Sequence, residues 1–463
     1  MGETKGVRGL ERLAAVIADA EALARKQSLT EPELAASLDD IYQGFFEADF
    51  CDYDLGEVRR LASGLITRNF EAYLSLRDAI PGWRAEALMS RRVQIAIRNV
   101  FRAARYARDL LGEILLEHPR LGRKENTLSA FAGPEIFTQK PPALGPGPVE
   151  LMPGDVLLQR GRVHNSAAIA RVGDVDSQFS HISIVAPDDD GKLVMVEALI
   201  EEGSIVTSLD AALAHGIGRA ILFRCRDREL AERSSRMIRE AIVSTAASAE
   251  TRILYDFTME VGGYRELYCA KLVRLAYSMG STGDLQLPTF ATRLDMKNRD
   301  FVARIGVTAT QTFAPGDMEL EPGFDIVAEW HDYRVSSELR LKDMIMLKLF
   351  EWMESHDYRF RPTLFARFIG RFGAATAHWP RFMQGLAKRV AGKVPPNMGA
   401  EAVTAIAMLH WTAEELYAEL RKLEDKSVRD TGRQLHPRLV LGHLERMRAE
   451  RGRRIGYLVT RQG

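Results

Sequence analysis

Cysteine is scarce in this chain: three occur among 463 residues, at positions 51, 225 and 269, and no two of them form a CxxC pair. An odd number of widely separated cysteines excludes a disulfide framework and a cysteine-based structural zinc site, and it is typical of a reducing compartment. No apolar run reaches about 18 residues, the length that a membrane-spanning helix needs. The N-terminus also lacks the basic flank and apolar core of a secretion signal. We therefore expect a cytoplasmic protein.

The chain also has no net charge, because 63 Lys and Arg residues balance 63 Asp and Glu residues. No overall field draws it to nucleic acid, so any attraction of that kind has to be local. The sequence contains no phosphate-binding loop, no dinucleotide-binding glycine pattern, no HExxH zinc motif and no GxSxG motif. We expect no cofactor, no bound metal and no nucleic-acid partner, and the sequence does not indicate an oligomeric state.

The apolar content is high enough for two or three globular domains, since 46% of the residues are hydrophobic. Residues 8–130 repeat apolar side chains at three- and four-residue steps, which predicts about four amphipathic helices. The segment 133–153 contains six prolines, so it predicts a linker rather than a helix or a central strand. From about residue 337 the helical period returns.

Between the linker and the C-terminal region, five short runs rich in Val, Ile and Leu predict strands of a mostly antiparallel sheet. These runs are GDVLLQRG, HISIVAP, KLVMVEAL, GSIVTSL and RAILFRC. Two helices follow, one at about 228–247 and one beginning near Glu266, and strands followed by helices indicate an α+β domain. The predicted division is a helical domain at 1–132, a linker at 133–153, an α+β domain at 149–335 and a helical region with a basic tail at 336–463.

Three polar residues of the α+β domain suggest thiol chemistry when they are taken together. Cys269 lies in the predicted first turn of a helix, where the helix N-terminus favours the nucleophilic thiolate. His181 lies on a strand, and Glu197 is the one charged residue of the apolar run LVMVEAL. Alone, a helical cysteine is usually a small buried side chain and a strand histidine a structural hydrogen-bond partner. As a set, they match the nucleophile, base and orienting carboxylate of a cysteine hydrolase.

The motifs around these residues occur in an order that resembles the circularly permuted NlpC-type papain-like cysteine hydrolases, the YiiX/YebB-like group. The motifs are GDVLLQRG, SHISIVA, VEAL and LYCAKLVRLAY, with PGDMELEPGFDIVAEW closing a region of about residues 150–335. The resemblance implies a permuted papain-like fold, His181 as the base, Cys269 as the nucleophile and Glu197 as the orienting group. It also implies that Tyr268 places an aromatic hydroxyl beside the cysteine, and that the protein acts on an amide or ester bond through an acyl-enzyme.

Two residues depart from the motifs of that group: Ser183 replaces a glycine and Lys271 replaces a glutamate. Lys271 points about half a helical turn away from Cys269, so we expect altered surface contacts or substrate preference and a retained nucleophile. If the three residues form one site, Cys269 Sγ lies within about 4 Å of one ring nitrogen of His181, and Glu197 approaches the other nitrogen.

The resemblance does not choose the substrate, because relatives of this fold include peptidoglycan peptidases, amidases and lipid acyltransferases such as lecithin retinol acyltransferase. Residues 358–393 contain eight Lys and Arg, no Asp or Glu, and several aromatic residues. Such a segment is typical of an anionic membrane surface, and equally of a helical hairpin that buries its aromatic residues and leaves its arginines in solvent. The tail from Ser427, with nine arginines and three acidic residues, predicts a solvated arm.

From these patterns we predict a lipid or N-acyl substrate, reached from a peripheral position at the inner membrane surface. Arg361, Arg367 and Arg371 are the predicted contacts with anionic lipid. Two alternatives stay open: a non-catalytic membrane-associated scaffold that binds an acyl or peptide ligand, and a peptidase or amidase that acts on cell-wall peptides.

Overall fold

Four helices make up the N-terminal part of the protein, as the periodicity predicts. The computed structural model describes residues 7–48, 54–116, 137–139, 149–213, 216–246, 252–294, 299–362, 395 and 397–460. The N-terminal helices are α1 (Val7–Arg25), α2 (Glu31–Glu47), α3 (Leu55–Ala85) and α4 (Arg91–Leu115). Helix α4 begins where Ser90 Oγ accepts a hydrogen bond from the backbone nitrogen of Val93 at 3.3 Å. Its residues Val93, Ile97 and Val100 repeat at helical spacing and are buried, so α4 faces the core.

A seven-stranded antiparallel sheet follows, with the strand order β1-β9-β6-β2-β3-β4-β5. Its strands are β1 (Phe137–Gln139), β2 (Val156–Gly161), β3 (His181–Pro187), β4 (Leu193–Leu199), β5 (Gly203–Ser208), β6 (Ile217–Cys225) and β9 (Phe324–His331). The five predicted strand runs form β2 to β6, because Val, Ile and Leu fit a sheet that is covered on both faces. The predicted α+β class is confirmed.

Helices and short elements surround this sheet. Along the chain, the elements that connect the strands from β2 to β9 are α5 (His164–Ile169), α6 (Leu209–Leu213), α7 (Arg228–Thr245), α8 (Cys269–Gly280), β7 (Thr292–Arg293), α9 (Arg299–Arg304), β8 (Gln311–Thr312) and a 3-10 helix (Pro315–Leu320). Helices α7 and α8 pack side by side and both contact β3 and β4. The first turn of α8 therefore lies close to the beginning of β3.

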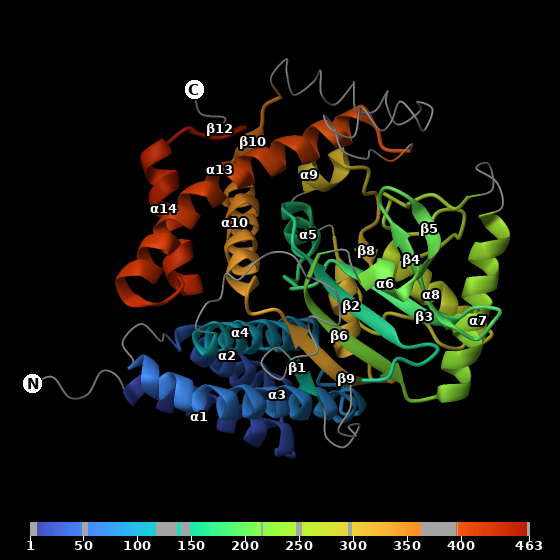
Figure 1. The fold of residues 1–463 in the computed structure, drawn as a ribbon, viewed down its shortest axis with the longest axis horizontal. Coiled ribbons are helices and arrows are strands. Elements are labelled where there is room, and N and C mark those ends of the chain that lie inside the picture. The colour runs from blue at the N-terminus through green and yellow to red at the C-terminus, as the bar shows by residue number, and fades with distance from the viewer. Residues whose placement is uncertain are drawn as a thin grey trace, which may run out of the picture.

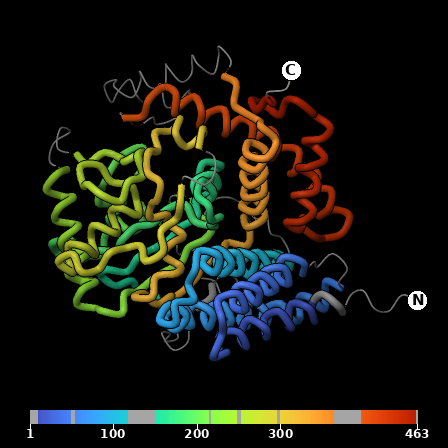
Figure 2. Tube along the Cα trace, turned by 180° about the vertical axis from the view of Figure 1, so that it is seen from behind, coloured from blue at the N-terminus to red at the C-terminus, as the bar shows by residue number. Residues whose placement is uncertain are grey.

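The described part of the C-terminal region combines three long helices with a small sheet. It contains α10 (Ser336–Ser355), β10 (Tyr358–Phe360), α13 (Ala400–Thr431), α14 (Pro437–Arg451), β11 (Arg454–Ile455) and β12 (Leu458–Thr460). Helix α10 contacts α4, α5, α13 and α14, and it stands between the N-terminal and C-terminal helices in Figure 1. Figure 2, the view from behind, also shows α13 lying across α5 and α9.

One expectation for the C-terminal region is wrong: the tail is not a solvated arm, because α14 packs on α10 through buried Val440 and Leu444. Charge counts describe solvated surface, and they do not show the apolar positions that lie between the arginines. The described start of the basic and aromatic segment is a strand that pairs with β12, with Tyr358 and Phe360 buried. Most of that segment lies outside the described residues, so the choice between a membrane surface and packed aromatic residues stays a prediction.

The apolar core extends from the N-terminal helices into the sheet as one cluster that includes Leu13, Val100 and Ile184. A second cluster joins Ala168 of α5 and Phe301 of α9 to the C-terminal helices. The boundaries that we drew between domains therefore stay a prediction. In the described parts of the chain, no helix is long and apolar enough to cross a membrane.

Candidate active site

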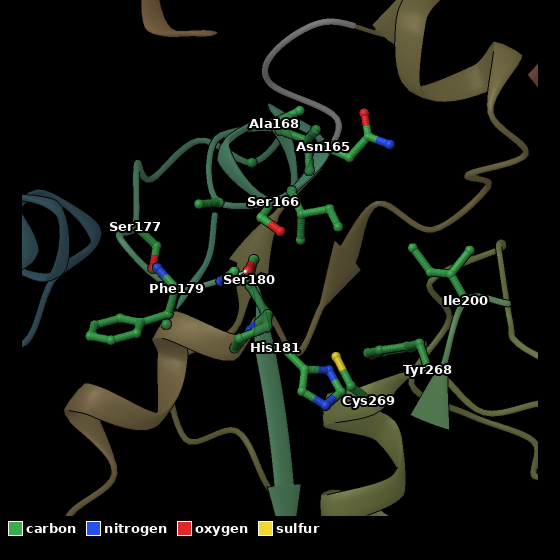
Figure 3. A pocket seen from close by; sticks show the side chains of 18 of the residues that line it. Asn165, Ser166, Ala168, Ser177, Phe179, Ser180, His181, Ile200, Tyr268 and Cys269 are labelled. Atoms are coloured by element: carbon green, nitrogen blue, oxygen red, sulfur yellow. Dashed lines mark hydrogen bonds between the residues drawn. The ribbon is translucent and has the colours of Figure 1, made fainter. Parts of the chain in front are cut away.

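The structure brings together the three residues that the sequence suggested for thiol chemistry. His181 is the first residue of β3, Cys269 is the first residue of α8, and Glu197 lies on β4. Figure 3 shows the imidazole of His181 beside the sulfur of Cys269 at the edge of a pocket. Glu197 Oε2 lies 2.9 Å from His181 Nε2, and the thiol of Cys269 is close enough to His181 to act on its pKa. Since Nε2 faces the carboxylate, Nδ1 is the nitrogen that is left for the thiol.

The electrostatics of this group favour a charged imidazole. Burial disfavours the imidazolium, but the hydrogen bonds to Cys269 and Glu197 and the negative charges of those two groups outweigh that effect. Together they raise the pKa of His181 to about 10. The imidazole beside Cys269 is therefore held in its charged form at neutral pH.

The N-terminus of helix α8 also lies at Cys269. Its N-cap residue, Tyr268, is extended and makes no side-chain capping bond to the first turn. The first backbone N–H groups of the helix therefore remain directed toward the region of Cys269, where they favour negative charge. The same groups suit the oxygen of a substrate carbonyl as it gains charge during attack.

A residue that the sequence analysis missed holds the carboxylate in place. Thr207 of β5 donates a hydrogen bond from Oγ1 to Glu197 Oε1 at 3.1 Å. Both carboxylate oxygens of Glu197 thus have a partner, and the side chain is buried. The pairing of β4 with β5 places Thr207 opposite Met195, two residues from Glu197. The role of Thr207 could therefore be predicted only from the register of this hairpin.

Tyr268 lies beside Cys269 in Figure 3, but its hydroxyl is engaged elsewhere. Its oxygen accepts hydrogen bonds from Thr312 Oγ1 at 2.9 Å and from the backbone nitrogen of Phe313 at 3.3 Å. These bonds fasten the start of α8 to β8 and the residue after it. The ring of Tyr268 borders the pocket, and its hydroxyl holds the beginning of α8 in place.

Lys271 does not make the surface contacts that we expected. It is buried, and its Nζ donates a hydrogen bond to Asp256 Oδ2 at 2.7 Å. Asp256 also accepts from the backbone nitrogen of Thr258 at 2.8 Å. The angle of Lys271 around the helix did not predict its burial, because the loop before α8 covers that face of the helix. The ion pair anchors this loop, whose residues Tyr255 and Phe257 line the pocket, so an effect on substrate preference stays a prediction.

The pocket beside the thiol is large, with a volume of about 790 Å³, and both Cys269 and His181 line it. Gln159 of β2, which the sequence analysis did not single out, lies directly opposite His181 in the pairing of β2 with β3. Its side chain lines the same pocket. Its amide nitrogen is buried and has no hydrogen-bond partner among the described residues.

The remaining candidate residues lie away from this site or outside the described chain. Arg361 follows β10 and is exposed, whereas Arg367 and Arg371 lie outside the described residues, as does Cys51. Cys225 is buried at the end of β6, and burial raises the pKa of its thiol. Among the described residues, no group of three or more His, Cys, Asp or Glu side chains is arranged to hold a metal ion.

Comparison with known proteins gives one match. Residues 150–320 match the family model described as "Permuted papain-like amidase enzyme, YaeF/YiiX, C92 family". No curated protein and no solved structure matches the chain. The matched segment contains β2 to β6, α7 and α8, and with them the Cys269, His181 and Glu197 cluster.

Proposed function

Residues 150–320 of this chain belong to the permuted papain-like amidase family, and from that membership we propose that Cys269 is the nucleophile of a cysteine hydrolase. The reaction we propose is cleavage of an amide or ester bond through a thioester intermediate on Cys269. His181 is the acid and base, Glu197 orients it, and Tyr268 positions the helix of the nucleophile.

A single observation carries this proposal: one imidazole lies beside a thiol and is paired with a buried carboxylate. An arrangement of this kind costs free energy to keep inside a protein, because it holds charged groups out of water. A purely structural cysteine needs neither partner, since it behaves as a small apolar side chain. The arrangement is what nucleophilic catalysis by cysteine requires.

The first half of the reaction acylates the enzyme. The Cys269 thiolate attacks the carbonyl carbon, and the electron pair of the C=O bond moves to the oxygen. The oxygen receives hydrogen bonds from the first turn of α8 and from Gln159. The intermediate then collapses, the bond to the leaving group breaks, and the His181 imidazolium gives its proton to the leaving nitrogen or oxygen. The products are a thioester on Cys269 and a neutral leaving group.

The second half releases the acyl group. His181 is now neutral, so its Nδ1 can accept a proton from water or from another nucleophile that enters the pocket. The activated oxygen attacks the thioester carbon, and the bond to Cys269 Sγ breaks. Sγ leaves as a thiolate, and His181 is again an imidazolium held by Glu197. Water gives a carboxylic acid, and a different nucleophile gives an acyl-transfer product.

The family implies a small-molecule or peptide substrate, and we propose that it is a lipid or N-acyl compound. The support comes from the pocket, where much of the lining is apolar, including Phe257, Met259 and Ile200. Apolar walls favour a hydrocarbon chain over a polar peptide. Recruitment from an anionic membrane is a further part of this proposal, and it rests on the sequence of residues 358–393 alone.

Selective labelling of the thiol tests the proposed function. Iodoacetamide, applied to the whole protein near neutral pH, should alkylate Cys269 far faster than Cys225. The two thiols are buried alike, with 4% and 3% of their surface exposed, so Cys225 is a matched internal control. The expected difference follows from the thiolate at Cys269, because only the thiolate displaces iodide to form the thioether.

The His181→Ala variant is the second arm of this experiment. Removing the imidazolium should abolish the preference for Cys269, since the thiolate then loses its nearest positive charge. Peptide mapping by mass spectrometry measures both rates. Equal labelling of the two cysteines in the unmodified protein would reject the enzyme and favour a scaffold that only binds an acyl or peptide ligand.

A further inference from the structure

One face of helix α13 borders the pocket of Cys269, although α13 lies outside the family segment. The residues of that face are Val403, Ile406, Ala407, His410 and Trp411. Their spacing is the three- and four-residue pattern of a single helix face. Four of them, all but Val403, are only partly buried, as expected for side chains that face a cavity rather than the core.

The opposite wall of this part of the pocket includes apolar side chains beside the polar Asn165 and Ser166. Ala168 and Ile169 come from α5, and Phe301 and Ile305 come from α9 and the residue after it. Helix α13 contacts both α5 and α9, and Figure 1 and Figure 2 both show it lying across them. We call the space between these three helices the α13 chamber.

The other end of the pocket has a different character. Arg98 and Arg102 of α4 line it, and each guanidinium pairs with a carboxylate: Arg98 with Asp317 and Arg102 with Asp176, both at 2.8 Å. Figure 1 and Figure 2 place α4 and α13 on opposite sides of the region that contains α5. The pocket is therefore amphipathic, with an apolar end at α13 and a charged, internally compensated end at α4.

We propose that the α13 chamber binds the hydrocarbon chain of an acyl substrate and that the face of α13 that borders the pocket sets the chain length that the protein accepts. This inference rests on the proposed function and names the part of the substrate that the C-terminal region recognises. A single cavity holds both the thiol and the chamber, so a chain that enters the chamber stays connected to a carbonyl at Cys269. Burial of each further methylene in such a chamber should tighten binding by roughly 4-fold.

Chain-length dependence tests the chamber. The probes are the p-nitrophenyl esters of acetate, octanoate and palmitate, and the measured quantity is the ratio of kcat/KM for octanoate to that for acetate. Ala407→Phe places a ring in the chamber and should lower this ratio by about 10-fold or more. Ala418→Phe is the matched control: it makes the same change on an exposed position of α13, and it should leave the ratio unchanged.

Two further measurements separate the chamber from the proposed chemistry. Trp411→Ala enlarges the chamber and should raise the palmitate to octanoate ratio, which keeps the inference testable if Ala407→Phe does not fold. Binding of the fluorescent fatty acid cis-parinaric acid to Cys269→Ala protein needs no turnover, and Ala407→Phe in that background should weaken it. Wild-type chain-length ratios in Ala407→Phe and Trp411→Ala would overturn the inference. Loss of ester hydrolysis with retained, Ala407-sensitive binding would reject only the proposed function.

Discussion

Cys269→Ala and His181→Ala should each lower kcat for p-nitrophenyl octanoate by about 10⁴-fold or more. The reason is that the thiolate and the imidazolium act as one unit: without either residue, no thioester forms at a useful rate. For the same reason the double variant should be little worse than either single variant, although independent contributions would multiply. Circular dichroism checks that each variant is folded. Additive losses in the double variant would contradict the proposed pair.

Glu197→Gln should have a smaller effect and a different signature. The amide keeps a hydrogen-bond partner for His181 but removes the negative charge, which is one cause of the high pKa of His181, about 10. That pKa should fall. Since His181 has to be protonated to hold the thiolate and to protonate the leaving group, the alkaline limb of kcat/KM should move to lower pH. An unchanged alkaline limb for hydrolysis of N-octanoyl p-nitroanilide would show that Glu197 does not act through His181.

Glu329→Gln should cause the largest loss of stability among single charge changes on β9. Glu329 is buried and accepts hydrogen bonds from Arg105 and Arg108 of α4, and His331 Nε2 lies 2.9 Å from it. Removing the carboxylate leaves two buried guanidinium groups without their shared anion. Breaking a buried pair in this way costs about 3 to 5 kcal/mol of the free energy of unfolding, which urea denaturation measures.

Asp325 provides a matched control on the same strand. It pairs with Arg226 at 3.0 Å, but the two side chains are 40% and 49% exposed. Asp325→Asn should therefore cost about 1 kcal/mol or less, because solvent screens exposed pairs. Equal losses from Glu329→Gln and Asp325→Asn would contradict a role for the buried network in joining the N-terminal helices to the sheet.

The same network predicts how stability depends on pH. Burial disfavours the charged form of Glu329, but Arg105, Arg108 and His331 outweigh it and hold the pKa of Glu329 well below its ordinary value of 4.5. A carboxylate whose pKa is lower in the folded state stabilises the protein at pH values above its ordinary pKa. This contribution is lost as the pH falls from the ordinary pKa toward the folded-state pKa. Glu329→Gln should therefore show a shallower loss of unfolding free energy between about pH 5 and pH 2 than the wild type.

The site residues could be found from sequence because each stands out locally. Glu197 is a lone charge in an apolar strand, and Cys269 begins an amphipathic helix. His181 begins a short apolar strand, and these three signals need no knowledge of long-range packing. The fold class could be predicted for the same reason, since the change from helical to strand period is a local property.

Other features depend on contacts between distant segments, and the sequence alone did not give them. The partner of Lys271 is Asp256, which lies in a loop without any periodic pattern. The chamber wall on α13 depends on how a C-terminal helix packs over α5 and α9, more than 95 residues earlier in the chain. Arginines such as Arg105 and Arg108 resemble solvated charges in sequence, and burial in an ion network is a tertiary property.

Trapping the acyl-enzyme tests the central proposal most directly. The whole protein is mixed with p-nitrophenyl octanoate, the reaction is stopped with acid within the first turnover, and the digested peptides are analysed by mass spectrometry. The expected result is an octanoyl thioester on the peptide that contains Cys269, with release of one equivalent of p-nitrophenol, and no adduct in Cys269→Ala or on Cys225. An octanoyl group on another residue, or undiminished p-nitrophenol release by Cys269→Ala, would contradict Cys269 as the nucleophile.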